Sequence, residues 1–342
     1  MTTANATTTN SGIRTRVLIL SDTHSALPDP INTPDLPYSH TFPSADLAIH
    51  CGDLTSTGKL HEHERALTLL KSLPARIKLV IPGNHDLTLD QDYCATHPHL
   101  YDWSRPHTKA DLEAAHQLYT SPEARETFGI IYLTEGTHAL TLPNGATLKI
   151  YASPYTPEFC DWAFAHPKHV DRFNAPNTTT NTNTTPTNPI PTFHPTSSSP
   201  SSSNIHILIT HGPPHKILDL TTTNTAVGDT HLRTALLRAK PLLHCFGHIH
   251  ESWGHQILHH NDTTTDNNTK TESKALDDEA ISESSNLNTP IMNKIGECAY
   301  IDATALEHGI QTVCVNASIM SVEYEACQRG WVVDLMLPST VQ

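Results

Sequence analysis

Residues 77–86 read Ile-Lys-Leu-Val-Ile-Pro-Gly-Asn-His-Asp, and this stretch decides the fold. Its first half is a short apolar run with one lysine, which is typical of a buried β-strand. A proline and a glycine end the run, and the polar side chains of Asn84, His85 and Asp86 follow directly. The stretch therefore predicts a strand that delivers polar groups at its carboxyl end.

The same arrangement recurs after four other apolar runs, which we predict to be strands. These runs cover residues 17–20, 47–50, 205–209 and 242–246, and they are followed by Ser21-Asp22-Thr23-His24, Cys51-Gly52-Asp53, Thr210-His211-Gly212 and Gly247-His248-Ile249-His250. In open α/β sheets, ligands bind at the carboxyl ends of the strands. Five strand ends that carry Asp, Asn or His therefore predict one shared site.

Helical patterns lie between these runs. Residues 61–73 place alanine and leucine on one face and are followed by Pro74, which ends a helix. Residues 109–119 show a second apolar face, and residues 148–151 predict one further strand. Strands that alternate with helices predict an α/β layer architecture.

The chain of 342 residues is long enough for one large domain or two ordinary ones. We predict a disordered tail over residues 1–13 and a single domain over residues 14–342. Two polar, low-complexity segments, at about 174–204 and 259–290, interrupt that domain. Neither offers enough apolar surface to offset its ordering entropy, so we expect both to be mobile surface insertions.

Charge and composition exclude some classes of protein. The formal net charge is −14, whereas proteins that bind nucleic-acid polymers usually carry a basic footprint. We find neither a signal peptide nor an apolar run that could span a bilayer, so we expect a cytoplasmic protein without a membrane partner. Seven cysteines without a Cys-x-x-Cys pair indicate reduced thiols. The oligomeric state stays open.

The strand-end residues have the chemistry of metal ligands. Carboxylate, amide oxygen and imidazole suit divalent ions, and we expect two of them, Mn²⁺ in the first place, with Fe²⁺, Zn²⁺ and Mg²⁺ as alternatives. Each motif alone has an ordinary explanation, because Gly52-Asp53 also suits a turn and Asn84 also suits a helix cap. It is the conjunction of five motifs at equivalent positions that indicates a metal site.

The ordered set of five motifs resembles the calcineurin-like metallophosphoesterase superfamily. The longer strings Thr-His-Gly-Pro-Pro from residue 210 and Gly-His-Ile-His-Glu from residue 247, together with Val-Asn-Ala-Ser from residue 315, are similar to its subgroup of metallophosphoesterase domain-containing proteins. The resemblance implies a four-layer αββα sandwich, in which two mixed β-sheets pack face to face with helices outside.

The resemblance also implies a site with two metals. One metal would be held by Asp22, His24 and His250, the other by Asn84, His211 and His248, with Asp53 bridging the two. His85 would act beside the metals as a proton donor or phosphate-binding group. Asp86 would orient His85, as carboxylates do behind functional histidines.

The implied activity is hydrolysis of a phosphoester by a hydroxide that two metals activate. Ser56 stands three residues after Asp53, where the protein phosphatases of the family have an aspartate and its purple acid phosphatases have a tyrosine. This difference leaves a phosphodiesterase acting on a small, nucleotide-like substrate, cyclic nucleotides included. The alternatives are a phosphomonoesterase and a non-catalytic, protein-binding scaffold on the same fold. Trp103, Trp162 and Phe164 could stack on a base or pack in the core or a lid.

Overall fold

Two mixed β-sheets form the centre of the computed structural model, which describes residues 12–39, 41–97, 108–175, 188–195, 204–260 and 293–339. The seven-stranded sheet has the order β12 (Lys294–Ile295), β13 (Cys298–Asp302), β15 (Trp331–Leu337), β1 (Ile13–Leu20), β2 (Ala45–His50), β3 (Ala75–Val80) and β4 (Ile130–Tyr132). The six-stranded sheet has the order β11 (Gly254–His259), β14 (Gln311–Asn316), β10 (Leu243–Phe246), β9 (Ile207–Thr210), β6 (Thr147–Ser153) and β5 (Gly136–Thr141).

Parallel pairing at the centre of each sheet brings strand ends together. β1, β2, β3 and β4 run parallel in one sheet, and β6, β9, β10 and β14 run parallel in the other. Antiparallel strands, such as β15 beside β1 and β11 beside β14, make both sheets mixed. The carboxyl ends of neighbouring parallel strands therefore meet at a single edge of each sheet.

The alternation of side chains along β1 shows why the sheets stack. Val17 and Ile19 point into the core between the sheets, whereas Leu18 and Leu20 point to the opposite face and pack under helices. All four side chains are buried, because this strand is covered on both faces. Strands of this kind read as continuous apolar runs, which is the pattern that the sequence shows.

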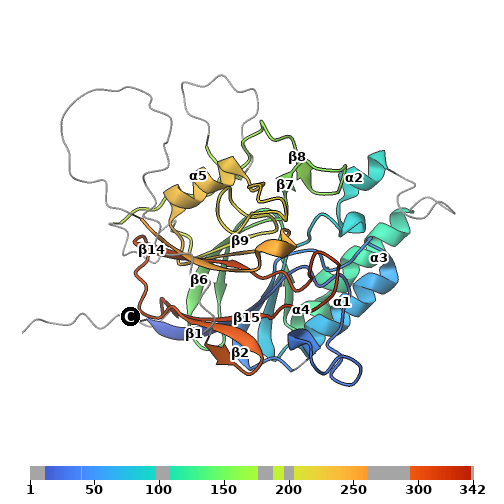
Figure 1. Cartoon of the computed structure of the whole chain (residues 1–342), viewed down its shortest axis with the longest axis horizontal. Helices are drawn as coiled ribbons and strands as arrows, with labels where there is room; N and C mark the ends of the chain where they lie inside the picture. Colours follow the sequence, from blue (N-terminus) through green and yellow to red (C-terminus); the bar gives the residue numbers. More distant parts are fainter. Residues whose placement is uncertain are drawn as a thin grey trace, which may run out of the picture.

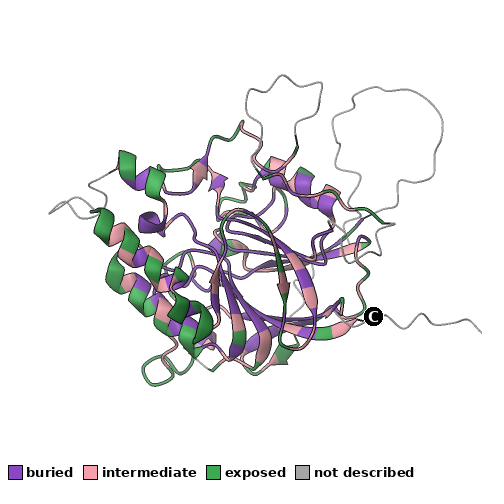
Figure 2. Ribbon diagram, turned by 180° about the vertical axis from the view of Figure 1, so that it is seen from behind, coloured by how far each residue is buried: buried purple, intermediate pink, exposed green. Residues whose placement is uncertain are grey.

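Helices form the two outer layers. The outer face of the seven-stranded sheet is covered by α1 (Leu60–Ser72), α3 (Lys109–Thr120) and α4 (Pro122–Glu126), and that of the six-stranded sheet by α5 (Thr230–Ala239). Figure 1 shows α1 and α3 side by side, away from α5. In Figure 2 the strands are mostly buried, whereas the helices expose their outer faces. The predicted four-layer sandwich is confirmed.

Shorter elements complete the chain. They are the 3-10 helices η1 (Pro37–Ser39), η2 (Leu87–Leu89) and η3 (His250–Ser252), the helix α2 (Gln91–Thr96), and a small parallel sheet of β7 (Thr156–Pro157) and β8 (Ala165–His166). Both predicted helices form within one residue of their predicted bounds, whereas α2, α4 and α5 were not predicted. Within the described ranges, no helix has the length and apolar character needed to cross a membrane.

The predicted tail and insertions need two corrections. Ile13 pairs with Leu337 and so belongs to β1, while residues 1–11 lie outside the described ranges. Residues 188–195, inside the first predicted insertion, pack against the domain: Ile190 is buried, and its carbonyl accepts a hydrogen bond from Arg238. The prediction of mobile insertions is therefore wrong for these eight residues, and also at the edges of both insertions, where Asn204 and His260 are buried and His259 belongs to β11. The remaining parts, residues 176–187, 196–203 and 261–292, lie outside the description.

Candidate metal centre

The polar segments after β1, β2, β3, β9 and β10 meet at one end of the sandwich. Main-chain bonds join them directly: the amide of Asp22 donates to the carbonyl of Gly52, and the amide of His248 donates to the carboxylate of Asp22, 3.0 Å away. Gly247 is required here, because a Cβ at this position would run into the carboxylate of Asp22. The hydrogen bond from His248 to Asp22 joins the two sheets at the site, because the two residues follow β10 and β1, which belong to different sheets.

Four of the polar residues adopt a left-handed backbone conformation. The φ angles are 52° at Asp22, 43° at His24, 53° at Asp53 and 70° at His248. Non-glycine residues rarely adopt such angles, and they persist where the surrounding structure fixes them. This backbone strain, gathered at the strand ends, directs the side chains of the four residues toward a common centre.

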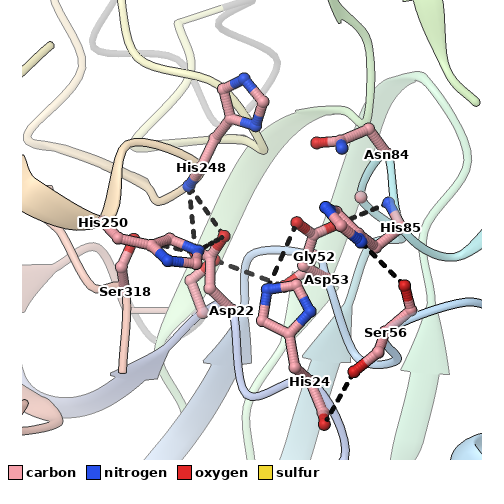
Figure 3. Close-up of polar contacts among 12 residues, drawn as sticks. Asp22, His24, Gly52, Asp53, Ser56, Asn84, His85, His248, His250 and Ser318 are labelled. Atoms are coloured by element: carbon pink, nitrogen blue, oxygen red, sulfur yellow. Dashed lines mark hydrogen bonds and ion pairs between the residues drawn. The ribbon is translucent and has the colours of Figure 1, made fainter. Parts of the chain in front are cut away.

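The first group of metal-compatible side chains contains Asp22, His24 and His250. All three are buried, and each offers a ligand atom within 4.8 Å of the others. The Nε2 atom of His250 lies 3.4 Å from a carboxylate oxygen of Asp22. Figure 3 shows these side chains facing one another across the site.

The second group contains Asp53, His211 and His248, again with ligand atoms within 4.8 Å of one another. Asn84 joins it, because its side-chain oxygen lies 2.8 Å from Nε2 of His211. One carboxylate oxygen of Asp53 lies 3.3 Å from Nε2 of His211 and 3.8 Å from Nε2 of His24. Asp53 therefore stands between the two groups.

Three histidines of these groups are held in the orientation that metal ligation requires. Their Nδ1 atoms donate to main-chain carbonyls, His24 to Thr55 at 3.0 Å, His211 to Cys51 at 2.9 Å, and His250 to Ser321 at 2.9 Å. A hydrogen bond at Nδ1 fixes the ring and leaves the lone pair of Nε2 for a metal.

The Nε2 atom of His24 provides a direct test of fit. It is buried and has no hydrogen-bond partner in the described part of the chain. A buried polar atom without a partner is costly, and a bound cation would satisfy it. The residues present therefore fit a pair of divalent ions.

Electrostatics favour the forms that bind cations. Burial lowers the pKa of His24 to about 4 and that of His248 to about 3, so both are neutral at pH 7. Burial opposes ionisation of Asp53, but the charges of His211 and His85 outweigh it and hold the pKa of Asp53 well below its usual range. Neutral imidazole and ionised carboxylate are the states in which these side chains ligate.

His211 differs from His24 and His248 in its protonation. Burial lowers its pKa, but the negative charge of Asp53 and a hydrogen bond to it outweigh burial and raise the pKa to about 9. Metal binding releases protons from its ligands, so a cation held by Nε2 would take the place of this proton.

His85 lies beside both groups. Its amide donates to Asp53 at 2.8 Å, its Nδ1 donates to the carbonyl of Ser56 at 2.8 Å, and its ring centroid lies 4.8 Å from that of His24. Trp162 packs on its ring with the centroids 4.0 Å apart. These contacts fix the ring of His85 next to the predicted ligands.

The predicted role of Asp86 is wrong. Its carboxylate does not contact the ring of His85; it accepts hydrogen bonds from the amides of Leu54, Thr55 and Gly83 and from the hydroxyl of Thr55, at 2.7–3.1 Å. Asp86 thus joins the loop that carries Asp53 to the loop that carries Asn84, because a buried carboxylate collects nearby main-chain donors.

Several residues of the site carried no clear signal in the sequence. Ser318 donates its hydroxyl to Asp22 at 2.9 Å, and only its place in the Val-Asn-Ala-Ser string pointed to it. The carbonyl of Ser56, which orients His85, has no sequence signature. Of the predicted aromatic candidates, Trp162 lies on His85, Phe164 is buried, and Trp103 is outside the described residues.

Comparison with known proteins adds a family match. The model of the family described as calcineurin-like phosphoesterase matches residues 15–252. The metallophosphoesterase domain-containing protein 1 of Homo sapiens is 33% identical over 245 residues, which are 70% of this chain and 62% of that protein. The mouse protein of the same name matches equally.

A probable rhamnogalacturonate lyase C of Emericella nidulans is 32% identical over 248 residues, 71% of this chain and 18% of that protein. The chain thus aligns to less than two thirds of the length of these curated relatives. A solved phosphopantetheinyl hydrolase from Mycobacterium tuberculosis aligns with a TM-score of 0.33 and 15% identity, covering 68% of this chain and 82% of that one.

Proposed function

Because the chain belongs to the calcineurin-like phosphoesterase family, we propose that it is a metal-dependent phosphodiesterase acting on a small, nucleotide-like ester, cyclic nucleotides included. The observation that carries the proposal is the pair of Asp/His groups joined through Asp53, with histidine Nε2 atoms turned toward the shared centre. In structural metal sites, protein ligands fill every coordination position of the metal. Two neighbouring metal sites can instead hold a substrate between them and promote its reaction.

Each group would hold one divalent ion, with Mn²⁺ as the first candidate. Asp22, His24 and His250 would bind one ion, Asn84, His211 and His248 the other, and Asp53 both. When bound, two such ions supply Lewis-acid stabilisation of the phosphoryl oxygens and lower the pKa of water. The buried carboxylates of Asp22 and Asp53 supply the negative charge that holds cations in place.

His85 has the position of a proton donor. Its Nδ1 atom is engaged by the carbonyl of Ser56, so Nε2 is the atom left to give a proton to the leaving oxygen. Trp162 and the amide contact to Asp53 prevent the ring from turning away. A donor held in this way can neutralise a poor, alkoxide leaving group.

Two alternatives make different demands on the site. A phosphomonoesterase needs groups that bind the extra negative charge of its substrate. Ser56 stands where two monoesterase branches of the family place an aspartate or a tyrosine. In this chain the hydroxyl of Ser56 donates to the carbonyl of His24. A non-catalytic scaffold does not need ordered histidines. The carbonyl partners of His24, His211 and His250 support the catalytic reading.

The test is hydrolysis by metal-free protein to which Mn²⁺, Mg²⁺ or Zn²⁺ is returned. Bis(p-nitrophenyl) phosphate, p-nitrophenyl phosphate and a cyclic nucleotide cover the diester, monoester and nucleotide substrates. We expect Mn²⁺ to restore diester hydrolysis above monoester hydrolysis. Protein that binds Mn²⁺ tightly and hydrolyses none of the three would contradict the enzyme and favour the scaffold, whereas a higher monoester rate would favour the phosphomonoesterase.

A further inference from the structure

The turn after β14 places the ring of Tyr324 against three histidines of the metal centre. The ring centroid of Tyr324 lies 5.0 Å from that of His24, 5.2 Å from that of His250 and 6.1 Å from that of His85. Even so, Tyr324 is 53% exposed. Part of an aromatic ring is therefore open to solvent beside the group that contains His24 and His250.

Hydrogen bonds hold this ring in place relative to the centre. The carbonyl of Ser321 accepts from Nδ1 of His250 at 2.9 Å and from the amide of Tyr324 at 3.0 Å. The side chain of Gln328 donates to the carbonyls of both His250 and Met320. The turn that orients a predicted metal ligand is thus the turn that presents Tyr324.

Tyr324 has a backbone conformation that is unusual for an aromatic residue. Its φ angle is 59°, in the left-handed region that favours glycine and asparagine. Strain of this kind gathers at functional sites. No described residue hydrogen-bonds to the hydroxyl of Tyr324, so a polar contact does not explain why tyrosine stands here. The partly exposed aromatic ring is therefore the feature that a tyrosine provides at this position.

We propose that Tyr324 contacts the substrate by stacking on a planar aromatic group of the phosphoester, so that the site prefers esters that carry such a group near phosphorus. This inference rests on the proposed function, because it assumes that the phosphoryl group lies between the two Asp/His groups. A planar group that is attached to that phosphoryl and directed toward His24 and His250 would meet the ring of Tyr324, which lies against both histidines in a half-exposed residue.

Binding of phosphonates tests the inference without turnover, since their carbon–phosphorus bond resists phosphoester hydrolysis. The dissociation constants of phenylphosphonate and methylphosphonate are measured by calorimetry on the manganese-loaded chain, for wild type, Tyr324→Ala and Tyr324→Phe. Val322→Ala is the matched control, because Val322 is 42% exposed on the same turn. Manganese content is measured for each variant.

We expect wild type to prefer phenylphosphonate over methylphosphonate, and Tyr324→Ala to reduce that preference by about 5- to 150-fold, the range of aromatic stacking on a base. Tyr324→Phe and Val322→Ala should keep it. An unchanged preference in Tyr324→Ala with its metal content intact overturns the inference. A loss of metal in Tyr324→Ala overturns it as well, because Tyr324 would then support the ligand histidines.

A second pair of probes separates the two kinds of planar group. The probes are adenosine 5′-monophosphate and ribose 5-phosphate, and their affinities are compared by binding or by inhibition of diester hydrolysis. In adenosine 5′-monophosphate the aromatic ring lies one sugar further from phosphorus than in phenylphosphonate. If adenosine 5′-monophosphate binds better than ribose 5-phosphate and this preference depends on Tyr324, the substrate is a nucleoside ester. If only the preference for phenylphosphonate over methylphosphonate depends on Tyr324, the substrate is an aryl ester. If the aromatic preference is present but no diester is hydrolysed, the inference stands and the proposed phosphodiesterase fails.

Discussion

The Nδ1 atom of His85 donates a hydrogen bond to the main-chain carbonyl of Ser56 across 2.8 Å. Ser56 follows Asp53 by three residues, so the loop that carries the central carboxylate of the site also sets the ring of the proposed proton donor. The amide of His85 in turn donates to Asp53 at 2.8 Å. These two hydrogen bonds, both donated by His85, couple the proposed proton donor to the metal centre without making its ring a ligand.

His85→Ala should keep its metals and lose turnover. A positioned general acid contributes about 10²–10⁴-fold, so we expect a loss of that order on an ester with a poor leaving group. The loss should be smaller for nitrophenyl esters, which need little proton donation. Metal content and rates are measured together on both ester types, with the exposed His61→Ala as control. An equal loss on both esters would assign His85 to phosphate binding instead.

Asp86→Asn should destabilise the fold around the site. The substitution turns a donor toward main-chain amides that now donate to a carboxylate. Burial raises the pKa of Asp86 to about 7, so the carboxylate is charged above that pH, where hydrogen bonds to charged groups contribute about 1.5–3 kcal/mol each. We expect the free energy of unfolding in urea to fall by about 2–4 kcal/mol, with weaker metal binding. Asp92→Asn, at an exposed position on α2, should change neither. A stable Asp86→Asn variant whose only defect is turnover would restore the original idea that Asp86 acts on His85.

Asp53→Asn and His24→Ala should differ in metal content. Asp53 lies within 3.8 Å of histidines from both groups, whereas His24 belongs to the first group alone. Elemental analysis of manganese-saturated protein should show about two ions in wild type. His24→Ala should retain the second ion, and Asp53→Asn should lose affinity for both. Wild type that saturates with a single ion would rule out the two-metal site.

His63, which belongs to neither Asp/His group, should make stability depend on pH. Burial lowers its pKa from 6.5 to about 3, and its ring nitrogens contact the hydroxyls of Tyr119 and Thr88 at 2.9 Å. Between these pKa values the unfolded chain binds a proton that the folded chain does not, so stability falls as pH drops below 6.5.

Over the interval from pH 7 to pH 5, this one group should remove about 2 kcal/mol of unfolding free energy. Urea unfolding of metal-free protein at the two pH values measures the loss, which should shrink by that amount in His63→Gln. His61→Gln, which replaces an exposed histidine of the same helix, should leave the loss unchanged. If His63→Gln shows the full wild-type loss, the titration of His63 is not its source.

The sequence alone determined six parallel strands of the two sheets and the positions of the candidate ligands along the chain. Apolar runs such as residues 17–20 and 77–81 must be buried, and buried parallel strands deliver the residues after them to one edge. Asp22, Asp53 and Asn84 were therefore predictable, because their place depends on local pattern and on pairing between neighbouring strands. The structure brings them together as that pattern requires.

Only the tertiary structure decided how these side chains are supported. The carbonyls of Ser56, Thr55 and Ser321 orient histidines, yet a main-chain carbonyl is the same group in every residue and leaves no trace in sequence. Tyr324 reaches the site through a turn that is more than seventy residues from His250, and its place depends on how that turn packs.

The same reason explains the wrong prediction for Asp86 and the packed residues 188–195. Asp86 is adjacent to His85 in sequence, but its carboxylate accepts hydrogen bonds from three main-chain amides and from the hydroxyl of Thr55. Ile190 and Phe193 are the large apolar residues of this otherwise polar segment. Ile190 is buried because it packs in the cluster that contains Phe173 and accepts a hydrogen bond from Arg238. Local pattern fixes what a segment can form, whereas long-range packing fixes which partner it meets.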